Sequence, residues 1–295
     1  MNFRNTNTGI LLRRWMAKWL FYPVYVLQYL VIYYRLFVTN TSKPLVIVLT
    51  IGKVGSSSIY YSLKQQLTNR IFHIHYLSDK GIETSWKKHK TSSRKSVPLH
   101  LITSKILSKL LKKVNYKTYI ITVFREPVQR KLSSFFQNLD QFKNEVDLKG
   151  LNFDETKIKA VLNDDYINSI INEEDQWINQ ELKSTFNFNV YNMEDILKDH
   201  FIIERLNNFE LLALKMESLN SCFIQAISQF FNTKEDIVLE TFNDGGEKYY
   251  NQSYKEFKDS FKLEAATLDR ICNTTYFRTF YSDEETKVRK KWVKS

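Results

Sequence analysis

Residues 45–58 read Leu45-Val46-Ile47-Val48-Leu49-Thr50-Ile51-Gly52-Lys53-Val54-Gly55-Ser56-Ser57-Ser58. The first part is an unbroken apolar run rich in β-branched residues, which is typical of a strand buried on both faces. The glycines and serines that follow indicate a tight turn, and the spacing of Ile59, Leu63 and Leu67 predicts a helix after it. The stretch therefore predicts a buried strand, a loop and a helix start, which is a building unit of α/β folds.

The loop of this unit has the chemistry of an anion-binding site. If the helix begins at the serines, its first backbone N–H groups and the positive end of its dipole point into the loop. Serine hydroxyls and a lysine ammonium would converge on the same small volume, which suits a phosphate or a sulfate. The residues expected to bind this anion are Lys53, Val54, Gly55, Ser56, Ser57 and Ser58.

A second stretch, residues 119–136, repeats the pattern of a buried strand that ends at a charged turn. Pro127 stands where the first turn of a following helix tolerates proline. Arg125 then lies at the end of the strand, while Arg130 and Ser133 lie three residues apart on one helix face. Two guanidinium groups and a hydroxyl would therefore surround a second anion.

The segments around these motifs predict the rest of the fold. Residues 71–77 predict a strand, residues 87–97 a polar loop and residues 101–114 a helix. Strands that alternate with helices imply a parallel sheet with right-handed crossovers, and ligands of such sheets lie at the carboxyl ends of the strands, where both motifs fall. From residue 151 onward helical patterns dominate, with helices expected at 157–172, 173–182 and 218–231 and a late strand at 209–216.

Together, Lys-x-Gly-Ser-Ser after one strand and Arg-x-Pro-x-x-Arg-x-x-Ser-x-Phe after another resemble the sulfotransferase superfamily. The resemblance implies a P-loop-like, three-layer α/β/α fold with a central parallel sheet and a helix-rich C-terminal half. It also implies the co-substrate PAPS (3′-phosphoadenosine 5′-phosphosulfate), the product PAP (3′-phosphoadenosine 5′-phosphate) and no metal. The first loop would hold the 5′-phosphosulfate and the second element the 3′-phosphate.

More narrowly, residues 44–292 resemble bacterial capsular polysaccharide synthesis proteins of sulfotransferase-like type. The loop has serines and Gly52 where cytosolic small-molecule sulfotransferases carry threonines and a proline, which points to the carbohydrate-modifying branch. The resemblance implies sulfuryl transfer to a hydroxyl of a glycan acceptor. The Gly-Gly-x-Lys segment that starts at Gly245 and contains Lys248 resembles the sulfotransferase segment that closes over the nucleotide. A simple surface turn explains this segment equally well.

Sulfuryl transfer needs charge stabilisation on the departing phosphate and a base for the acceptor proton. Lys53 is the candidate for the first role. His100, at the start of a predicted helix, is the first candidate for the base, because its position is similar to that of the base histidine in uronosyl 2-O-sulfotransferases. His75 is the second candidate, and the acidic patch at residues 173–175 is the third.

Two rival functions remain open. A nucleotide-dependent kinase with a degenerate P-loop is one, although the Walker A order fails because Lys53 precedes Gly55. A catalytically inert, sulfotransferase-like scaffold in polysaccharide assembly is the other, and the intact Lys53, Arg125 and Ser133 argue against it. No Gly-x-Gly-x-x-Gly fingerprint is present, which argues against a dinucleotide enzyme.

The composition fits one sizeable domain that attracts anions. The 295 residues carry a formal charge of +11, but no recognised nucleic-acid motif is present, so nucleic acid is not an expected partner. Two cysteines without metal-ligand spacing, Cys222 and Cys272, argue against a disulfide framework and a zinc site. We expect a catalytic domain over residues 43–295 behind an extension over residues 1–42.

The extension is hydrophobic and basic. Its uncharged core at residues 19–34 is shorter than the ~20 residues that span a bilayer, and it is rich in tyrosine and tryptophan with cations on both sides. No Ala-x-Ala-type cleavage site follows it, so a removable signal peptide is not expected. Residues 13–38 are therefore expected to lie on an anionic membrane surface, with a short signal anchor or a helix folded against the domain as alternatives. The expected location is cytoplasmic, peripheral on the inner face of the plasma membrane.

Overall fold

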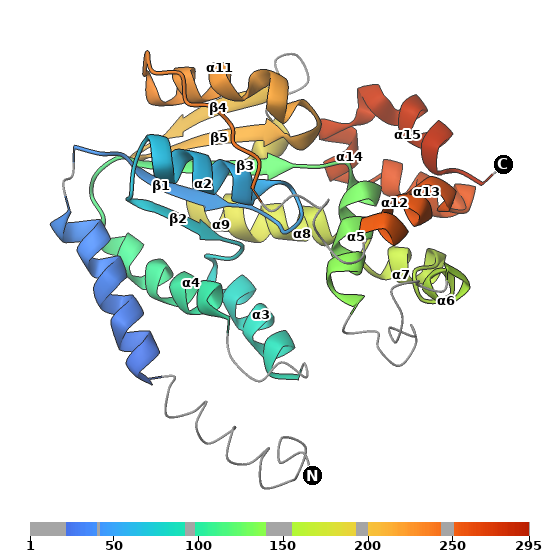
Figure 1. The fold of residues 1–295 in the computed structure, drawn as a ribbon, viewed down its shortest axis with the longest axis horizontal. Helices are drawn as coiled ribbons and strands as arrows, with labels where there is room; N and C mark the ends of the chain where they lie inside the picture. The colour runs from blue at the N-terminus through green and yellow to red at the C-terminus, as the bar shows by residue number, and fades with distance from the viewer. Residues whose placement is uncertain are drawn as a thin grey trace, which may run out of the picture.

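One mixed sheet forms the centre of the protein in the computed structural model, which describes residues 22–39, 42–91, 98–139, 155–192, 200–242 and 251–294. The strand order is β2-β1-β3-β5-β4 (Figure 1). The strands are β1 (Leu45–Leu49), β2 (Ile71–Ile74), β3 (Thr118–Phe124), β4 (Phe201–Leu206) and β5 (Phe209–Lys215). β1 pairs in parallel with β2 and β3, and β3 pairs in parallel with β5. The fold is therefore α/β, as the sequence predicts.

The expectation of a parallel sheet is wrong at one edge, where β4 pairs antiparallel with β5. Only Asn207 and Asn208 join the two strands, and Asn207 adopts a left-handed backbone with a φ of 55°. A connection this short can form a hairpin but cannot carry the crossover that a parallel pair requires.

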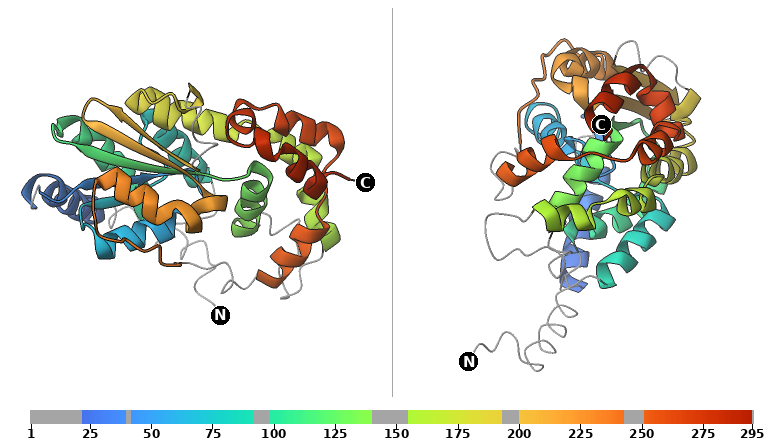
Figure 2. Two further views of the ribbon diagram at one scale, coloured as in Figure 1. Left: turned by 90° about the horizontal axis from the view of Figure 1, so that it is seen from above. Right: turned by 90° about the vertical axis from the view of Figure 1, so that its right-hand side faces the viewer.

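Helices cover both faces of the sheet. α2 and α11 lie on one side, and α4 and α9 lie on the other (Figure 2). This arrangement follows from right-handed crossovers, because the chain steps outward from β1 to β2 and then back across β1 to β3. The helices are α2 (Ser56–Gln66), α3 (Asp79–Thr91), α4 (Leu99–Leu110), α5 (Pro127–Gln137), α6 (Glu155–Val161), α7 (Asp164–Ser169), α8 (Glu173–Ile178), α9 (Ser184–Phe186), α11 (Leu219–Phe231), α12 (Asn251–Ser260), α13 (Ala265–Cys272), α14 (Thr275–Phe280) and α15 (Glu285–Trp292).

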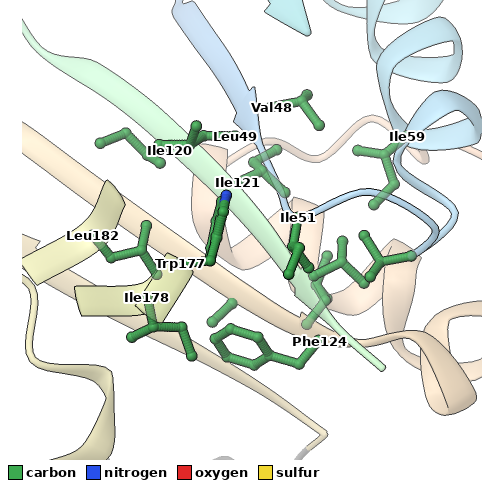
Figure 3. Close-up of a cluster of buried hydrophobic side chains, with 14 of the residues drawn as sticks. Val48, Leu49, Ile51, Ile59, Ile120, Ile121, Phe124, Trp177, Ile178 and Leu182 are labelled. Atoms are coloured by element: carbon green, nitrogen blue, oxygen red, sulfur yellow. The ribbon is translucent and has the colours of Figure 1, made fainter. Parts of the chain in front are cut away.

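The core lies between the sheet and its helices. Every residue of β1 is buried, which explains why the strand has no polar alternation. Figure 3 shows side chains of β1, β3 and α2 gathered with Trp177, Ile178 and Leu182 from the helical layer on the other side. At about 1.5–3 kcal/mol for each large buried side chain, this cluster fixes the positions of both strand ends.

The structure confirms the strand at residues 209–216 as β5 and the helices at 101–114 and 218–231 as α4 and α11, with small shifts of their ends. The polar loop expected at residues 87–97 is wrong in its first part, because α3 continues to Thr91. An i, i+4 ion pair between Glu83 and Lys87 supports that helix. Residues 92–97 lie outside the described part. The helix expected at 157–172 is divided into α6 and α7, since Asn163 caps α7 by accepting from the Tyr166 N–H.

Candidate functional site

The loop after β1 leaves the N-terminus of α2 without a side-chain cap. Gly55, which precedes the helix, has a φ of 75° and no side chain, and the first turn of α2 contains no acidic residue. α5 differs, because the Glu126 carboxylate accepts hydrogen bonds from the backbone N–H groups of Val128 and Gln129 at 2.7 and 3.1 Å. The first N–H groups of α5 are thus hydrogen-bonded within the protein, whereas the N-terminus of α2 suits an external anion.

Arg125 links the two motifs that the sequence predicts as anion sites. Its Nη1 donates to the Lys53 carbonyl oxygen at 2.8 Å, across 72 residues of chain. The backbone of Arg125 is held in turn by the Tyr276 hydroxyl, which accepts from the Arg125 N–H and donates to the Arg125 carbonyl, both at 2.9 Å. The ends of β1 and β3 therefore form one continuous surface around a half-buried guanidinium.

Lys258, which belongs to neither predicted anion motif, adds positive charge beside Arg125. Phe257 of α12 packs on Phe136 of α5 with ring centroids 5.4 Å apart, and this contact brings Lys258 near the end of β3. Burial, and then the charges of Lys291 and Arg125, lower the pKa of Lys258. Asp259 and Glu126 oppose the shift in part, but the net lowering indicates an excess of cations around Lys258, which favours a bound anion. No local pattern reveals Lys258, because its position depends on how α12 packs.

Two of the three loop serines have partners inside the protein. The Ser56 hydroxyl is hydrogen-bonded to His73 Nε2 at 2.8 Å. The Ser58 hydroxyl accepts from the Phe242 N–H at 3.1 Å and lies 3.3 Å from the Phe242 carbonyl, to which it donates. The Ser58 N–H donates to the Gly55 carbonyl at 3.2 Å, so an anion at the helix start would meet Ser56 mainly through its backbone N–H group. Lys248 lies six residues beyond Phe242, outside the described residues.

Three histidines from two separate segments meet beside this loop. The ring centroids of His73 and His75 are 5.4 Å apart, and those of His75 and His100 are 5.8 Å apart. His73 also stacks on Tyr60 at 5.6 Å. The two histidines named as base candidates are therefore neighbours, although 25 positions separate them in the sequence.

The surroundings of His75 determine which of its nitrogens can accept a proton. Nδ1 is 2.8 Å from the Thr50 carbonyl, which can only accept, so Nδ1 carries the hydrogen and Nε2 has the lone pair in the neutral ring. Burial lowers the pKa of His75, the Thr50 hydrogen bond opposes this effect in part, and the nearby Lys53 ammonium adds a smaller lowering. Trp177 Nε1 donates to the His75 carbonyl at 2.7 Å and fixes the backbone there.

The other two histidines differ from His75 in exposure and in partner. His100 is exposed in the first turn of α4. His73 is half-buried, and burial followed by the charges of His75 and His100 lowers its pKa to about 3. His73 is therefore neutral at physiological pH, and its hydrogen bond to Ser56 joins β2 to the start of α2.

Arg130, expected at the second anion, faces into the protein instead. Its side chain is 2% exposed, with Nε 2.8 Å from Glu174 and Nη2 2.5 Å from Glu173. Lys131 Nζ donates to both oxygens of Glu174 at 2.7 and 2.6 Å. Burial raises the pKa of Glu174, but Arg130 and Lys131 outweigh that effect and hold the pKa below its usual range. Arg130 therefore forms buried ion pairs within the protein. The Glu174 oxygens, which Arg130 and Lys131 occupy, are unavailable to act as a base. Asp175 accepts hydrogen bonds from Tyr191 and from the backbone of Tyr276.

Ser133 lies half-buried in the second turn of α5. The described residues include no group of three His, Cys, Asp or Glu side chains arranged to hold a metal ion. A cavity of about 620 Å³ lies elsewhere, and none of the predicted site residues lines it. Its walls include Asn208 and Phe209 at the start of β5, together with Leu77 and Ser78, which follow His75 by two and three residues.

These features define an α/β protein in which the ends of two neighbouring strands are joined by Arg125 and together form a candidate anion site. Residues 147–282 match the family described as "Putative capsular polysaccharide synthesis protein". The matched region begins after both anion motifs, yet it contains Glu174, Glu217 and Tyr276, which hold the helix and the turn that follow β3. No curated protein and no solved structure matches the chain.

Proposed function

We propose that this protein transfers the sulfuryl group of PAPS to a hydroxyl of a carbohydrate, in the synthesis of a capsular or cell-surface polysaccharide. The observation that carries the proposal is the hydrogen bond from Arg125 Nη1 to the Lys53 carbonyl. A nucleotide with anionic groups at both its 5′ and 3′ positions requires two anion sites at a fixed separation, and this bond fixes one motif against the other.

The residues present fit such a nucleotide. The uncapped N-terminus of α2 and the Lys53 ammonium suit the 5′-phosphosulfate, because donors converge there without an internal carboxylate. Arg125, Lys258 and the Ser133 hydroxyl suit the 3′-phosphate. Arg130 is left out of this assignment because Glu173 and Glu174 already bind it.

The reaction requires that the protein position the donor and the acceptor, stabilise the developing charge and provide a proton acceptor. The sulfur–oxygen bond to the 5′-phosphate breaks while the acceptor oxygen bonds to the sulfur, and the acceptor proton leaves to a base. Lys53 stabilises the charge that develops on the departing phosphate oxygen. Of the two histidines, His75 is favoured for the proton, because its Nε2 lone pair is oriented by the Thr50 hydrogen bond.

The carbohydrate acceptor is inferred from the family match over residues 147–282. That region includes Glu217 and Tyr276, which accept hydrogen bonds from the backbone of the turn after β3. We therefore infer that the glycan binds beside this turn, where the matched region contacts it.

Thermal unfolding with PAP, adenosine 5′-phosphosulfate and ATP, each with and without Mg²⁺, tests the nucleotide. We expect PAP to stabilise the protein without metal, by about 2.7 kcal/mol at a concentration of 100 Kd. Arg125→Ala should reduce this response, while Lys109→Ala, which removes an exposed lysine of α4, should leave it unchanged. Stabilisation by Mg²⁺-ATP and not by PAP would contradict the proposal and favour a kinase.

A further inference from the structure

The segment before β1 forms a helix that exposes apolar side chains in nearly every direction. Residues 22–33 are α-helical and continue as a π-helix at Tyr34–Val38. Leu27 and Leu30 are 60% and 57% exposed, and no charged residue occurs between Tyr22 and Tyr34. The large apolar side chains exposed on this helix are Tyr22, Val24, Val26, Leu27, Tyr29, Leu30, Val31, Tyr33, Tyr34 and Val38.

The last turn of this helix is firmly attached to the catalytic domain. Ile32 and Leu36 are buried in the common core. The buried Arg70 side chain donates to the carbonyl oxygens of Arg35 and Leu36 at 3.0 and 3.1 Å, and the Tyr116 hydroxyl donates to the Leu36 carbonyl at 2.6 Å. These donors occupy the negative end of the helix. In the preceding turns Tyr25 is half-buried against the core, while most of the other side chains of these turns are exposed (Figure 1).

We propose that residues 22–34 insert into the interfacial region of a lipid bilayer whose headgroups are anionic. Gln28 is the one residue between Tyr22 and Tyr34 with a side chain that is neither aliphatic nor aromatic, and the exposed surface of the helix is therefore mainly apolar and favours an apolar surrounding. Twelve α-helical residues at about 1.5 Å each extend roughly 18 Å, about the depth of one leaflet of a ~30 Å hydrocarbon layer. Within the described residues, no helix is both long enough and apolar enough to cross a bilayer.

Side-chain chemistry on the helix and next to it fits a lipid interface. Tyr22, Tyr29 and Tyr33 have the apolar body and polar tip that favour the headgroup level. Arg13, Arg14, Lys18 and Arg35 flank the apolar core in the sequence, and basic residues in such positions attract anionic headgroups. A second copy of the chain fits less well, because one partner helix covers one stripe and would leave the other sides in water. This inference is independent of sulfuryl transfer.

Flotation of the full chain with vesicles tests the inference. One set contains phosphatidylcholine alone, and the other contains phosphatidylcholine mixed with phosphatidylglycerol. We expect binding to the mixed vesicles that weakens at high salt. Leu27→Ser combined with Leu30→Ser should lower partitioning on the order of 100-fold, since each inserted leucine contributes about tenfold. The matched control, Ile224→Ser with Val238→Ser, removes two exposed apolar side chains elsewhere and should bind as the unmodified chain does.

The variant with Leu27→Ser and Leu30→Ser, called the helix variant, is expected to unfold as cooperatively as the unmodified protein, because the side chains of Leu27 and Leu30 face solvent. Light scattering without lipid provides the second readout. Equal vesicle binding by the helix variant and the unmodified chain would overturn the inference. A dimer that forms in the absence of lipid and is lost in the helix variant, with no vesicle binding, would overturn it in favour of self-association.

Discussion

The backbone of Lys53 has a φ of 75°, in the left-handed region. A residue with a Cβ atom adopts this conformation at a cost of about 1–2 kcal/mol, which glycine avoids. The conformation presents the Lys53 carbonyl to Arg125, so the strain is part of how the two strand ends are joined.

Replacing Lys53 separates backbone strain from chemistry. Lys53→Gly should be more stable than Lys53→Ala by about 1 kcal/mol, because only glycine relieves the strain. Both variants lose the ammonium, and both should lose turnover on the order of 100-fold. Thermal unfolding gives the first comparison, and sulfate transfer from PAPS to a panel of capsular glycans gives the second. Full turnover in either variant would show that the Lys53 ammonium does not stabilise the departing phosphate.

The roles of His75 and His100 can be distinguished by measuring PAP binding and turnover for an alanine variant of each. His75→Ala should keep the PAP-induced stabilisation and lose turnover on the order of 100-fold, as expected for a missing general base. His100→Ala should lose less than about tenfold, because that side chain is exposed at the edge of the site. Since the pKa of His75 is lowered, the rate should remain high as pH falls to 6.5 and decline only below it. The opposite ranking of the two variants would assign the base to His100.

His73 should make stability depend on pH. Its pKa is about 3 in the folded protein and near 6.5 when unfolded, so between these values the unfolded chain binds the extra proton. Stability therefore falls as pH decreases through this window, by at most about 1.4 kcal/mol per pH unit from this group. Chemical denaturation of His73→Gln between pH 4 and 7 should show a shallower dependence, and an unchanged slope would contradict the assignment.

At the scale of elements, the contrast between α2 and α5 makes a specific prediction. Ser57→Asp places a carboxylate in the first turn of α2, where the helix dipole stabilises it by about 0.3–1 kcal/mol. The same charge repels a phosphate. We expect Ser57→Asp to raise the melting temperature of the free protein slightly and to abolish stabilisation by PAP, whereas the uncharged Ser57→Asn should retain most of it. If Ser57→Asp responded fully to PAP, the anion would have to bind elsewhere.

Sequence patterns predicted the elements better than the contacts between them. The loop after β1 and the turn after β3 were recognised because turns and helix starts have local signatures. The inward orientation of Arg130 was not predicted, because its partners Glu173 and Glu174 lie more than 40 residues away in the sequence. Lys258 was missed for the same reason. A helical repeat places a residue on a face, but the partner that occupies that face is decided by tertiary packing.

At the scale of the whole molecule, separate segments from the second half of the chain hold the turn after β3. The Glu217 carboxylate accepts from the Glu126 N–H at 2.8 Å and from the Tyr281 hydroxyl at 2.9 Å. Trp292 Nε1 donates to the Glu126 carboxylate at 3.1 Å, and Tyr276 holds Arg125. The position of Arg125 therefore depends on helices that lie more than 140 residues further along the chain, which explains why no short stretch around it predicts the finished site.

Trp292 tests this dependence, because its indole reaches the turn from the last helix and is fully buried. Trp292→Phe keeps an aromatic ring but removes one donor from the buried Glu126 carboxylate, at an expected cost of about 1–3 kcal/mol in unfolding free energy. Trp292→Ala also opens a cavity and should cost about 3–5 kcal/mol.

If the C-terminal helices position Arg125, Trp292→Phe should also weaken PAP binding, measured by calorimetry at a temperature where the variant is folded. As the control, Arg289→Ala breaks surface ion pairs of the same helix and should leave PAP affinity unchanged. Equal affinities in all these proteins would show that the turn after β3 keeps its geometry without the C-terminal helices.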